Sequence, residues 1–504
     1  MSSWILPIAS SFPPWAAWPP VVQHMILKAL IEDGCSLARL APVSREWQDV
    51  IEAHNFAKIK ITPLRLVHFR ARTRRNRFRV KYIWLCVELD NYTCCEASFG
   101  GRRCVSQSDL DLVKATIGIL FAEISRWAPN GELVLDISVH SPSDSNYLLK
   151  NLSFKPDVPS RECLGLGDLG DLDDMDKAGR LWIRMLPSGQ AVNSIKKTFS
   201  WIRTDSTDVT SLDGESVHEE SPDEAECYYR DVGWLEQVPD VPAVTGVLLR
   251  QQTRRMWDGP LLTEMLDHFP NLRDVFYEPW RSLDPKWQDY KDQDYDHLID
   301  EVTRQAALGS RELEQFSAAY LVNAAMFFAS CRPSWTWPNL TSLSLTSSWL
   351  APDVSRTELV KMLTSAAKVA HRMPKLETME LWNGRRRLAT LFQYRPKPAT
   401  ITWRSTWEFD QLPSVISVWE GVAQKHGAGE LAVKRELLNR TNIKCHGDAI
   451  HYLKLSHPVV RPISLQQIRT ENEVHRTWEK MDTVKAQTES NLCRWGIKRG
   501  RSDL

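Results

Sequence analysis

The first apolar positions of the chain recur with helical spacing and directly follow two prolines. They are Val21, Val22, Met25, Ile26, Ala29 and Leu30. Proline's fixed φ suits a first helical turn, so a helix is expected to begin at the prolines and to end at Gly34. A short apolar turn follows, and a further helix is expected to begin at Ser44, whose hydroxyl can accept an amide proton of the next turn. Such short helices carry more apolar surface than they can bury among themselves, which predicts a docking unit.

Strand-like and helix-like segments alternate after this unit. Strands are expected over 55–62, 82–89, 133–139 and 244–249, and a helix over 110–127. A strand, a helix and a strand in this order favour a parallel sheet with the helix outside it. Between residues 141 and 240, Pro, Ser, Asp and Glu accumulate, so most of that segment is expected to be loop or partly disordered.

A unit made of a helix, a proline and a strand recurs in the C-terminal half. Its prolines are Pro270, Pro338 and Pro374, and the helices expected before them cover 261–266, 313–328 and 359–369. Each proline stops its helix, and a following Leu enters the core. The intervals between the prolines are unequal, so two interpretations stay open: degenerate leucine-rich repeats, or independent βα units that share a turn signal. Both predict an α/β fold with a parallel sheet and outer helices.

The last segments complete this body. Strands are expected over 389–394 and 400–403, a helix over 414–426, a strand or helix pair over 431–455, and a polar helix over 464–481. We therefore divide the chain into a helical unit (14–55), a first strand–helix–strand part (56–140), an irregular acidic and polar insertion (141–240), a repeat-like α/β body (241–482) and a frayed tail (483–504).

Charge and composition narrow the function classes. Lys plus Arg and Asp plus Glu both number 63, so no net field attracts the chain to nucleic acid or to an anionic membrane. No apolar run approaches the ~20 residues that cross a bilayer, and the first residues lack the charged start of a secretory signal. We expect an intracellular protein, cytoplasmic or nuclear, with no membrane partner and with its ten cysteines as reduced thiols.

The basic run Arg65–Lys81 is the exception to this neutral balance. Its cations are interleaved with Phe69 and Phe78. Cations on phosphates and aromatic rings on bases are what nucleic-acid binding needs, so a nucleic-acid surface is one interpretation. The favoured one is a solvated helix or loop beside an acidic partner, because one run in a neutral chain is a weak electrostatic footprint.

Motifs for cofactors, metals and catalysis fail on their surroundings. Residues 165–170 fit G-x-G-x-x-G, but no buried strand precedes them and the aspartates that follow would repel a phosphate. The acidic segment from Asp174 has Ala178 and Met185 where a calcium loop needs oxygen ligands. Four neighbouring cysteines also lack the paired spacing of zinc ligands. They are Cys86, Cys94, Cys95 and Cys104. We expect no cofactor, no metal and no catalytic residue, and hence no enzyme.

The N-terminal pattern resembles a known family. An apolar-Pro start, an Ile-Leu-x-x-Leu segment, a Leu-x-x-Leu segment and a Val-Ser-Arg-x-Trp end are similar to the F-box. The resemblance implies that this unit binds a Skp-type adaptor and tethers the chain to a cullin-RING ubiquitin ligase. The adaptor-binding residues that it implies are Pro19, Ile26, Leu27, Leu30, Leu37, Leu40, Val43 and Trp47.

The stretches 244–250, 277–280, 379–384 and 401–404 resemble a large family of uncharacterised F-box-like proteins of filamentous fungi. The two resemblances together imply a substrate receptor of an SCF-type ubiquitin ligase, with an adaptor on the F-box-like unit and an unknown protein substrate on a leucine-rich-repeat-like body. Substrate contacts are expected from four tryptophans at or just past strand ends. They are Trp280, Trp382, Trp403 and Trp407. Two alternatives stay open: a scaffolding F-box-like protein without a ligase, and a nucleic-acid-associated protein that uses the Arg65–Lys81 run.

Overall fold

The computed structural model describes residues 15–32, 37–91, 107–144, 180–185, 233–250, 259–278, 303–410, 412–427, 429–470 and 472–473. Gly34, Trp280 and the tail 483–504 lie outside these residues, as does most of the insertion 141–240. The expectations for those positions stay predictions.

Two helices and short 3-10 turns form the N-terminal unit. The helices are α1 (Pro20–Glu32) and α2 (Arg45–Ala57), and the turns are η1 (Trp15–Ala17), η2 (Leu37–Arg39) and η3 (Ala41–Val43). The Oγ of Ser44 accepts a hydrogen bond from the amide of Trp47 at 3.2 Å, which confirms the predicted start of α2. The strand expected over 55–62 begins later, as β1 (Lys58–Ile61), because α2 continues to Ala57.

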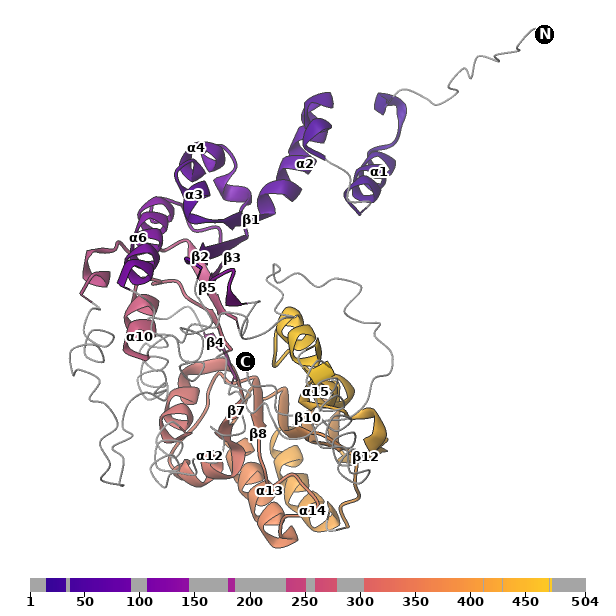
Figure 1. Ribbon diagram of the computed structural model, residues 1–504. Helices are drawn as coiled ribbons and strands as arrows, with labels where there is room; N and C mark the ends of the chain where they lie inside the picture. The colour runs from indigo at the N-terminus through magenta and orange to yellow at the C-terminus, as the bar shows by residue number, and fades with distance from the viewer. Residues whose placement is uncertain are drawn as a thin grey trace, which may run out of the picture.

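A twelve-stranded sheet runs through the rest of the described chain (Figure 1), in the order β1-β2-β3-β5-β6-β4-β7-β8-β9-β10-β11-β12. The strands after β1 are β2 (Tyr82–Glu88), β3 (Leu133–His140), β4 (Arg180–Met185), β5 (Val244–Leu249), β6 (Asp274–Tyr277), β7 (Leu313–Asn323), β8 (Ser342–Thr346), β9 (Thr378–Arg385), β10 (Leu388–Pro396), β11 (Ala399–Ser405) and β12 (Ala432–Leu437). Apart from β4, which lies between β6 and β7, the strands are arranged in the sheet in the order of the chain.

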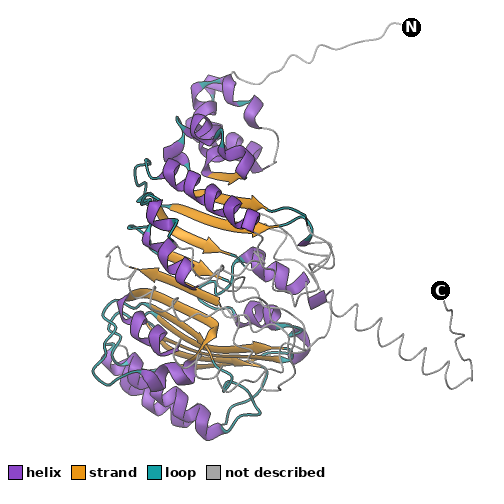
Figure 2. Ribbon diagram, turned by 60° about the vertical axis from the view of Figure 1, so that its left-hand side comes forward, coloured by secondary structure: helices purple, strands orange, loops and turns teal. Residues whose placement is uncertain are grey.

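Helices cover the two faces of the sheet unequally (Figure 2). The helices whose apolar residues join the larger core are α3 (Pro63–Leu66), α4 (Phe69–Thr73), α6 (Gln107–Ile124), α10 (Gly259–Asp267), α12 (Ala324–Ser330), α13 (Arg356–Ala370) and α14 (Leu412–Lys425). A smaller core on the opposite face holds α15 (His446–Leu453) and the helical segment 462–470. Adjacent residues of β9 show the division: Leu381 packs in the larger core and Trp382 in the smaller one, because successive side chains of a strand point to opposite faces.

The expected α/β class is confirmed, with helices packed on a largely parallel sheet. The expectation of a helix over 313–328 is wrong in its first part, since residues 313–323 form β7 and only Ala324–Ser330 are helical. The run Phe316–Ala319 is buried on both faces of the sheet, so it lacks the alternation that marks a half-exposed strand. The helix α12 then begins where the Asn323 side chain accepts a hydrogen bond from the Ala325 amide at 3.0 Å.

Two strands interrupt the expected parallel sheet. Among the described strands, β4 and β10 run antiparallel to both of their neighbours. β10 follows β9 through a two-residue turn at Arg386 and Arg387, and Arg387 has a positive φ of 59°. Such a tight turn can join only antiparallel strands, whereas a parallel pair needs a long crossover.

Candidate docking surface

The N-terminal unit has a small interior. Its large apolar side chains that are buried are Leu27, Leu37 and Ile51, with exposures of 2%, 7% and 1%. Its segments also meet through the Trp15 and Trp47 rings, which lie edge to face with centroids 4.9 Å apart. With so little apolar area inside, the unit gains limited stability from its own packing.

The eight residues implied by the F-box resemblance differ in exposure. Leu27 and Leu37 are buried, so they stabilise the unit and are not available to a partner in this conformation. The partly buried members are Ile26, Leu30, Leu40 and Trp47. Pro19 is exposed, and Val43 is 63% exposed. The structure therefore leaves Pro19 and Val43 open to solvent, together with the outer edges of the partly buried four.

Two exposed residues of α1 are absent from that set. Val21 is 70% exposed and Met25 is 64% exposed, and they lie one helical turn apart on the same face. The apolar stripe in the sequence contained both, but the family pattern favoured their neighbours. We call Val21, Met25 and Val43 the docking residues, because burying each side chain against a partner would contribute roughly 1.5–3 kcal/mol.

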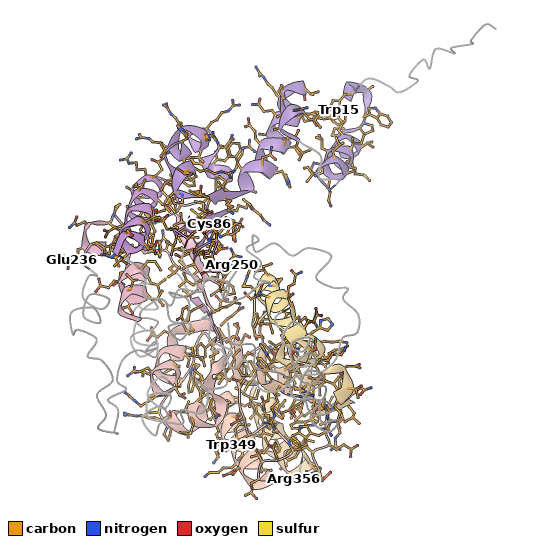
Figure 3. The ribbon with its side chains drawn as sticks, viewed as in Figure 1. Trp15, Cys86, Glu236, Arg250, Trp349 and Arg356 are labelled. Carbon is orange, nitrogen blue, oxygen red and sulfur yellow. The ribbon has the colours of Figure 1, made fainter. Side chains whose placement is uncertain are left out.

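The unit is attached to the body through α2. The Arg79 Nη1 donates to the Asp49 carbonyl oxygen at 3.1 Å, and the same guanidinium forms an ion pair with the Asp49 carboxylate. The Lys81 amide donates to the Ala57 carbonyl at 3.0 Å. Figure 1 shows α1 on the far side of α2 from β1, and Figure 3 shows Trp15 on this unit, apart from Cys86 and Arg250 in the sheet.

The tryptophans expected to contact a substrate lie mostly inside the protein. Trp280 is outside the described residues. Trp382 is fully buried, with its Nε1 donating to the Ser344 Oγ at 3.2 Å, and Trp403 is 3% exposed. Trp407 is partly buried and meets the Trp403 ring edge to face. Both faces of the sheet are covered here, so Trp382 and Trp403 are core residues and the expected substrate contact at these two positions is corrected.

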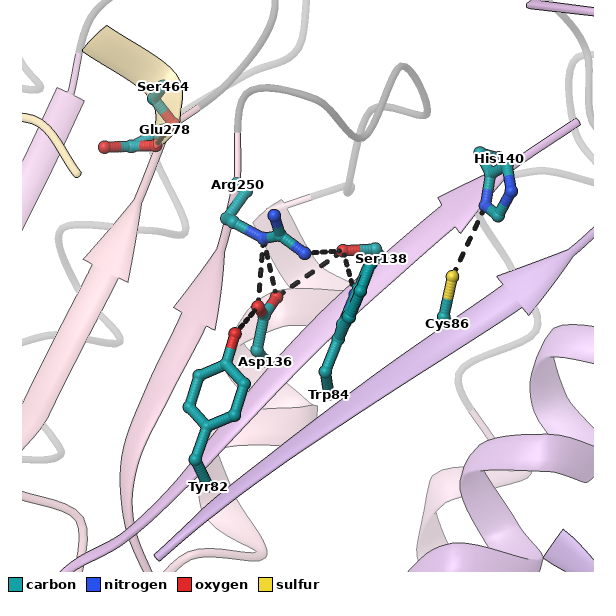
Figure 4. Close-up of polar contacts among 9 residues, drawn as sticks. All are labelled: Tyr82, Trp84, Cys86, Asp136, Ser138, His140, Arg250, Glu278 and Ser464. Atoms are coloured by element: carbon teal, nitrogen blue, oxygen red, sulfur yellow. Dashed lines mark hydrogen bonds and ion pairs between the residues drawn. The ribbon is translucent and has the colours of Figure 1, made fainter. Parts of the chain in front are cut away.

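A buried polar cluster that sequence patterns did not reveal lies on the sheet face opposite α6 and α10 (Figure 4). The Nε of Arg250 and the Oδ2 of Asp136 are 2.9 Å apart, and neither side chain is exposed. The Tyr82 hydroxyl donates to Asp136, while Arg250 Nη2 and Trp84 Nε1 donate to the Ser138 Oγ at 3.2 Å and 3.0 Å. These bonds join β2, β3 and the end of β5, so the cluster fits a structural role that fixes three adjacent strands.

A second polar contact joins the C-terminal segment to the sheet. Glu278 directly follows β6, and its carboxylate accepts hydrogen bonds from the Arg461 amide at 2.7 Å and from the Ser464 hydroxyl (Figure 4). The Arg461 guanidinium also lies over the Phe276 ring, 4.7 Å from its centroid. The segment that carries 462–470 is thereby tied to the end of β6.

The three cysteines that the structure describes are free thiols. Burial raises the pKa of Cys86, whose Sγ lies 3.7 Å from the Nδ1 of His140, and raises the pKa of Cys331 and of Cys445 to about 12. A nucleophilic cysteine needs a lowered pKa, because the thiolate is the reactive form. These groups therefore suit packing and not covalent chemistry.

The basic run is largely exposed. Arg70, Arg79 and Lys81 face the carboxylates of Glu123, Asp49 and Glu132. Five other arginines are exposed without an ion pair in the described part of the chain, and we call them the arginine set. They are Arg65, Arg72, Arg74, Arg75 and Arg77. The acidic neighbour expected from sequence is therefore present for part of the run only.

The described part of the chain contains neither a metal-binding cluster nor a helix that could span a membrane. No group of His, Cys, Asp and Glu side chains there is arranged to hold a metal ion. Nor does any described helix combine the length and the apolar character needed to cross a membrane. Segment 165–170, Asp174, Cys94, Cys95 and Cys104 lie outside the described residues.

Comparison with known proteins gives one similarity. The model of a family of unknown function (DUF6546) matches residues 261–461. This stretch contains the strands β6 to β12 and the helices α12 to α15. It does not include β1 to β5 or the N-terminal unit. No curated protein and no solved structure matches the chain. The C-terminal part of the sheet is thus similar to a family whose function is not established.

Proposed function

We propose that the chain is a substrate receptor of an SCF-type ubiquitin ligase, which binds a Skp-type adaptor through α1, η3 and α2. The observation that carries the proposal is the exposure of the docking residues, Val21, Met25 and Val43, at 63–70%. Large apolar side chains gathered on a small helical unit are typical of a surface that a partner covers. The pattern of these helices resembles the F-box, which supplies the identity of that partner.

The small interior of the unit supports the same proposal. Only three large apolar side chains are buried among its described residues, so the unit has little stability of its own beyond its contact with β1 and with η4 (Arg77–Arg79). A partner that buries the docking residues would add apolar contacts where the unit lacks them. The adaptor would thus stabilise the geometry that it binds.

The position of the unit suits a receptor. It lies next to β1 at one edge of the sheet, whereas β12 forms the other edge. Strands spaced ~4.8 Å apart place the edges of a twelve-stranded sheet about 50 Å from one another. A substrate held on the C-terminal body would not compete with the adaptor for space. The mechanism is positional, since the receptor holds the substrate near an enzyme on another subunit.

Co-purification tests this proposal. The tagged chain, co-expressed with a Skp-type adaptor and a cullin, should recover both proteins, and Met25→Asp should lower the adaptor recovery at least about tenfold, because a charge would be buried in an apolar contact. Val67→Asp is the matched control, since Val67 is 78% exposed and lies outside the N-terminal unit. A folded wild-type chain that recovers no adaptor would support the scaffolding alternative.

A second candidate function rests on the arginine set. These five cations lie near the exposed ring of Phe78 in the sequence, and they lack ion pairs among the described residues. Binding to single-stranded nucleic acid would show a steep loss of affinity with salt, with a slope of roughly −0.7 for each phosphate contacted. Replacing Arg72, Arg74 and Arg75 by Ala should then reduce the slope by about two units. Binding that is insensitive to salt would exclude this function.

A further inference from the structure

In the part of the chain that the structure describes, the strand β12 has one edge without a partner strand. It is the last strand in the order of the sheet (Figure 1), and all six of its residues are exposed. The amide of Leu438 donates to the Ser405 carbonyl of β11 at 2.7 Å. Backbone polar groups alternate in direction along a strand, so residues 432, 434 and 436 also face β11. Val433, Arg435 and Leu437 therefore direct their N–H and C=O groups toward the open edge.

The side chains of the same three residues form a regular pattern. They share one face of the strand, because they alternate with period two, and they read apolar, cationic, apolar. Val433 is 37% exposed and Leu437 is 66% exposed. Arg435 is exposed and has no ion pair in the part of the chain that the structure describes. On the other face, Glu436 is occupied by Arg404, whose Nε and Nη2 donate to it at 2.6 Å and 3.1 Å.

We propose that the open edge of β12 binds an extended segment of a partner protein as an additional strand, and that this segment carries a carboxylate between two apolar residues on one face. The outward N–H and C=O groups of β12 supply the main-chain hydrogen bonds of such a pairing. Val433 and Leu437 supply the apolar cross-strand contacts, and Arg435 pairs with the carboxylate.

A second copy of this chain fits the edge poorly. Antiparallel pairing of β12 with its copy, with the strands fully overlapped, would place Arg435 opposite Arg435 or Lys434 opposite Arg435. Like charges directly opposite one another destabilise a strand pair. Lysine and arginine on an edge strand also deter association with other basic edges. A segment with a carboxylate is instead attracted by Lys434 and Arg435, so the positive charge of this edge favours an acidic partner over a second copy of the chain.

Binding of a defined peptide to the full chain tests the inference. The probe is the fluorescein-labelled peptide Thr-Val-Thr-Glu-Thr-Val-Thr, blocked at its C-terminus. We expect saturable binding, which Arg435→Glu weakens about fivefold or more. Exchanging the Glu of the peptide for Lys should restore binding to that variant. Arg273→Glu is the matched control, since Arg273 is exposed beside β6 and away from β12.

The peptide backbone provides a test that needs no altered protein. In an added strand only alternate N–H groups face β12, so N-methylation of one alternate set of residues should abolish binding and N-methylation of the other set should preserve it. Equal effects of the two sets, undiminished binding to Arg435→Glu, or no saturable binding to the wild-type chain would each overturn the proposal. The test does not involve the adaptor, so its result is independent of the proposed ligase function.

Discussion

The Arg250 guanidinium and the Asp136 carboxylate form an ion pair in which the Nε and Oδ2 atoms are 2.9 Å apart and neither side chain is exposed to solvent. Arg250 follows β5 and Asp136 lies within β3, so the pair joins two neighbouring strands. The guanidinium also lies over the Trp84 ring of β2, 4.8 Å from its centroid. A buried charge is tolerated only when it is paired and hydrogen-bonded.

Removing one member of this pair should destabilise the protein strongly. We expect Arg250→Met to lower the free energy of unfolding by about 3–5 kcal/mol, because it leaves the Asp136 carboxylate buried without its counter-ion. Adding Asp136→Leu should recover a large part of that loss, since an apolar pair of similar volume needs no counter-charge. Urea unfolding of the two variants measures both effects. A single variant as stable as the wild type would show that the pair is solvated in solution.

Two glycines should respond to alanine in opposite directions. A Cβ on Gly384 would lie 2.6 Å from the Cβ of Ala449 in α15 and 3.1 Å from the hydroxyl oxygen of Tyr320, so Gly384→Ala must displace α15 from β9. We expect a loss of about 1–3 kcal/mol from this overpacking. Gly421 lies within α14 with open space around its Cβ position, so Gly421→Ala should stabilise by about 1 kcal/mol.

Thermal unfolding of these two variants provides the measurement. If both alanines changed the unfolding temperature in the same direction, the close approach of α15 to β9 would not be the cause of the effect at Gly384. A stable Gly384→Ala protein would argue that α15 packs elsewhere in solution.

Stability should fall as the pH drops below about 6.5, in part because of His426. Burial lowers the pKa of His426 from its ordinary value of 6.5; the hydrogen bond with the Met373 carbonyl opposes this shift, and the charge of His371 adds to it. The unfolded chain therefore binds a proton that the folded state takes up only at lower pH. By linkage, the contribution of the neutral His426 imidazole to the free energy of unfolding is present above pH 6.5, and it is lost as the pH falls through the lowered pKa of His426.

Two variants isolate this contribution. His426→Gln should reduce the difference in urea unfolding free energy between pH 7.5 and pH 5.5. Tyr394→Phe removes the hydroxyl 3.1 Å from the His426 Nδ1 but keeps the imidazole, so most of the pH dependence should persist. An unchanged pH profile in His426→Gln would assign the dependence to other groups.

Local chemistry in the sequence explains which elements were predictable. The hydroxyl of Ser44 marks the start of α2, because a helix cap bonds to the next turn only. The apolar runs of β2, β3 and β5 predict buried strands. The segment Phe316–Ala319 does not look like a strand in the sequence, because burial on both faces of β7 removes the alternation of apolar and polar residues. Residues of β4 pair with Tyr277 and with Ala318, partners far away in the sequence, so no local pattern could reveal the antiparallel insertion.

The same distinction applies to the candidate sites. The apolar stripe predicts the helix α1, but it does not distinguish Leu27, which is buried, from Met25, which is 64% exposed. Asp136 gave a signal, since a carboxylate inside an apolar strand requires a partner, yet its partner Arg250 is 114 residues away. The tryptophans of β9 and β11 carried no such signal, because tryptophan suits a core and an interface equally.

Loss of the cap at Ser44 should weaken adaptor binding more than it weakens the body. Ser44→Ala removes the hydrogen bond from the Trp47 amide, which costs about 1 kcal/mol of helix stability. If the adaptor binds the unit as proposed, its affinity should fall roughly fivefold, since ~1 kcal/mol of binding energy would be spent on ordering α2. Asn323→Ala is the matched control, because Asn323 caps α12 in the body by the same kind of bond, at 3.0 Å to the Ala325 amide. The Asn323→Ala variant should lower the stability of the body and leave adaptor affinity unchanged.

Titration calorimetry with the adaptor measures both affinities. Equal losses of adaptor affinity in the two variants would show that the general stability of the protein governs binding, and that the start of α2 does not contribute to it specifically.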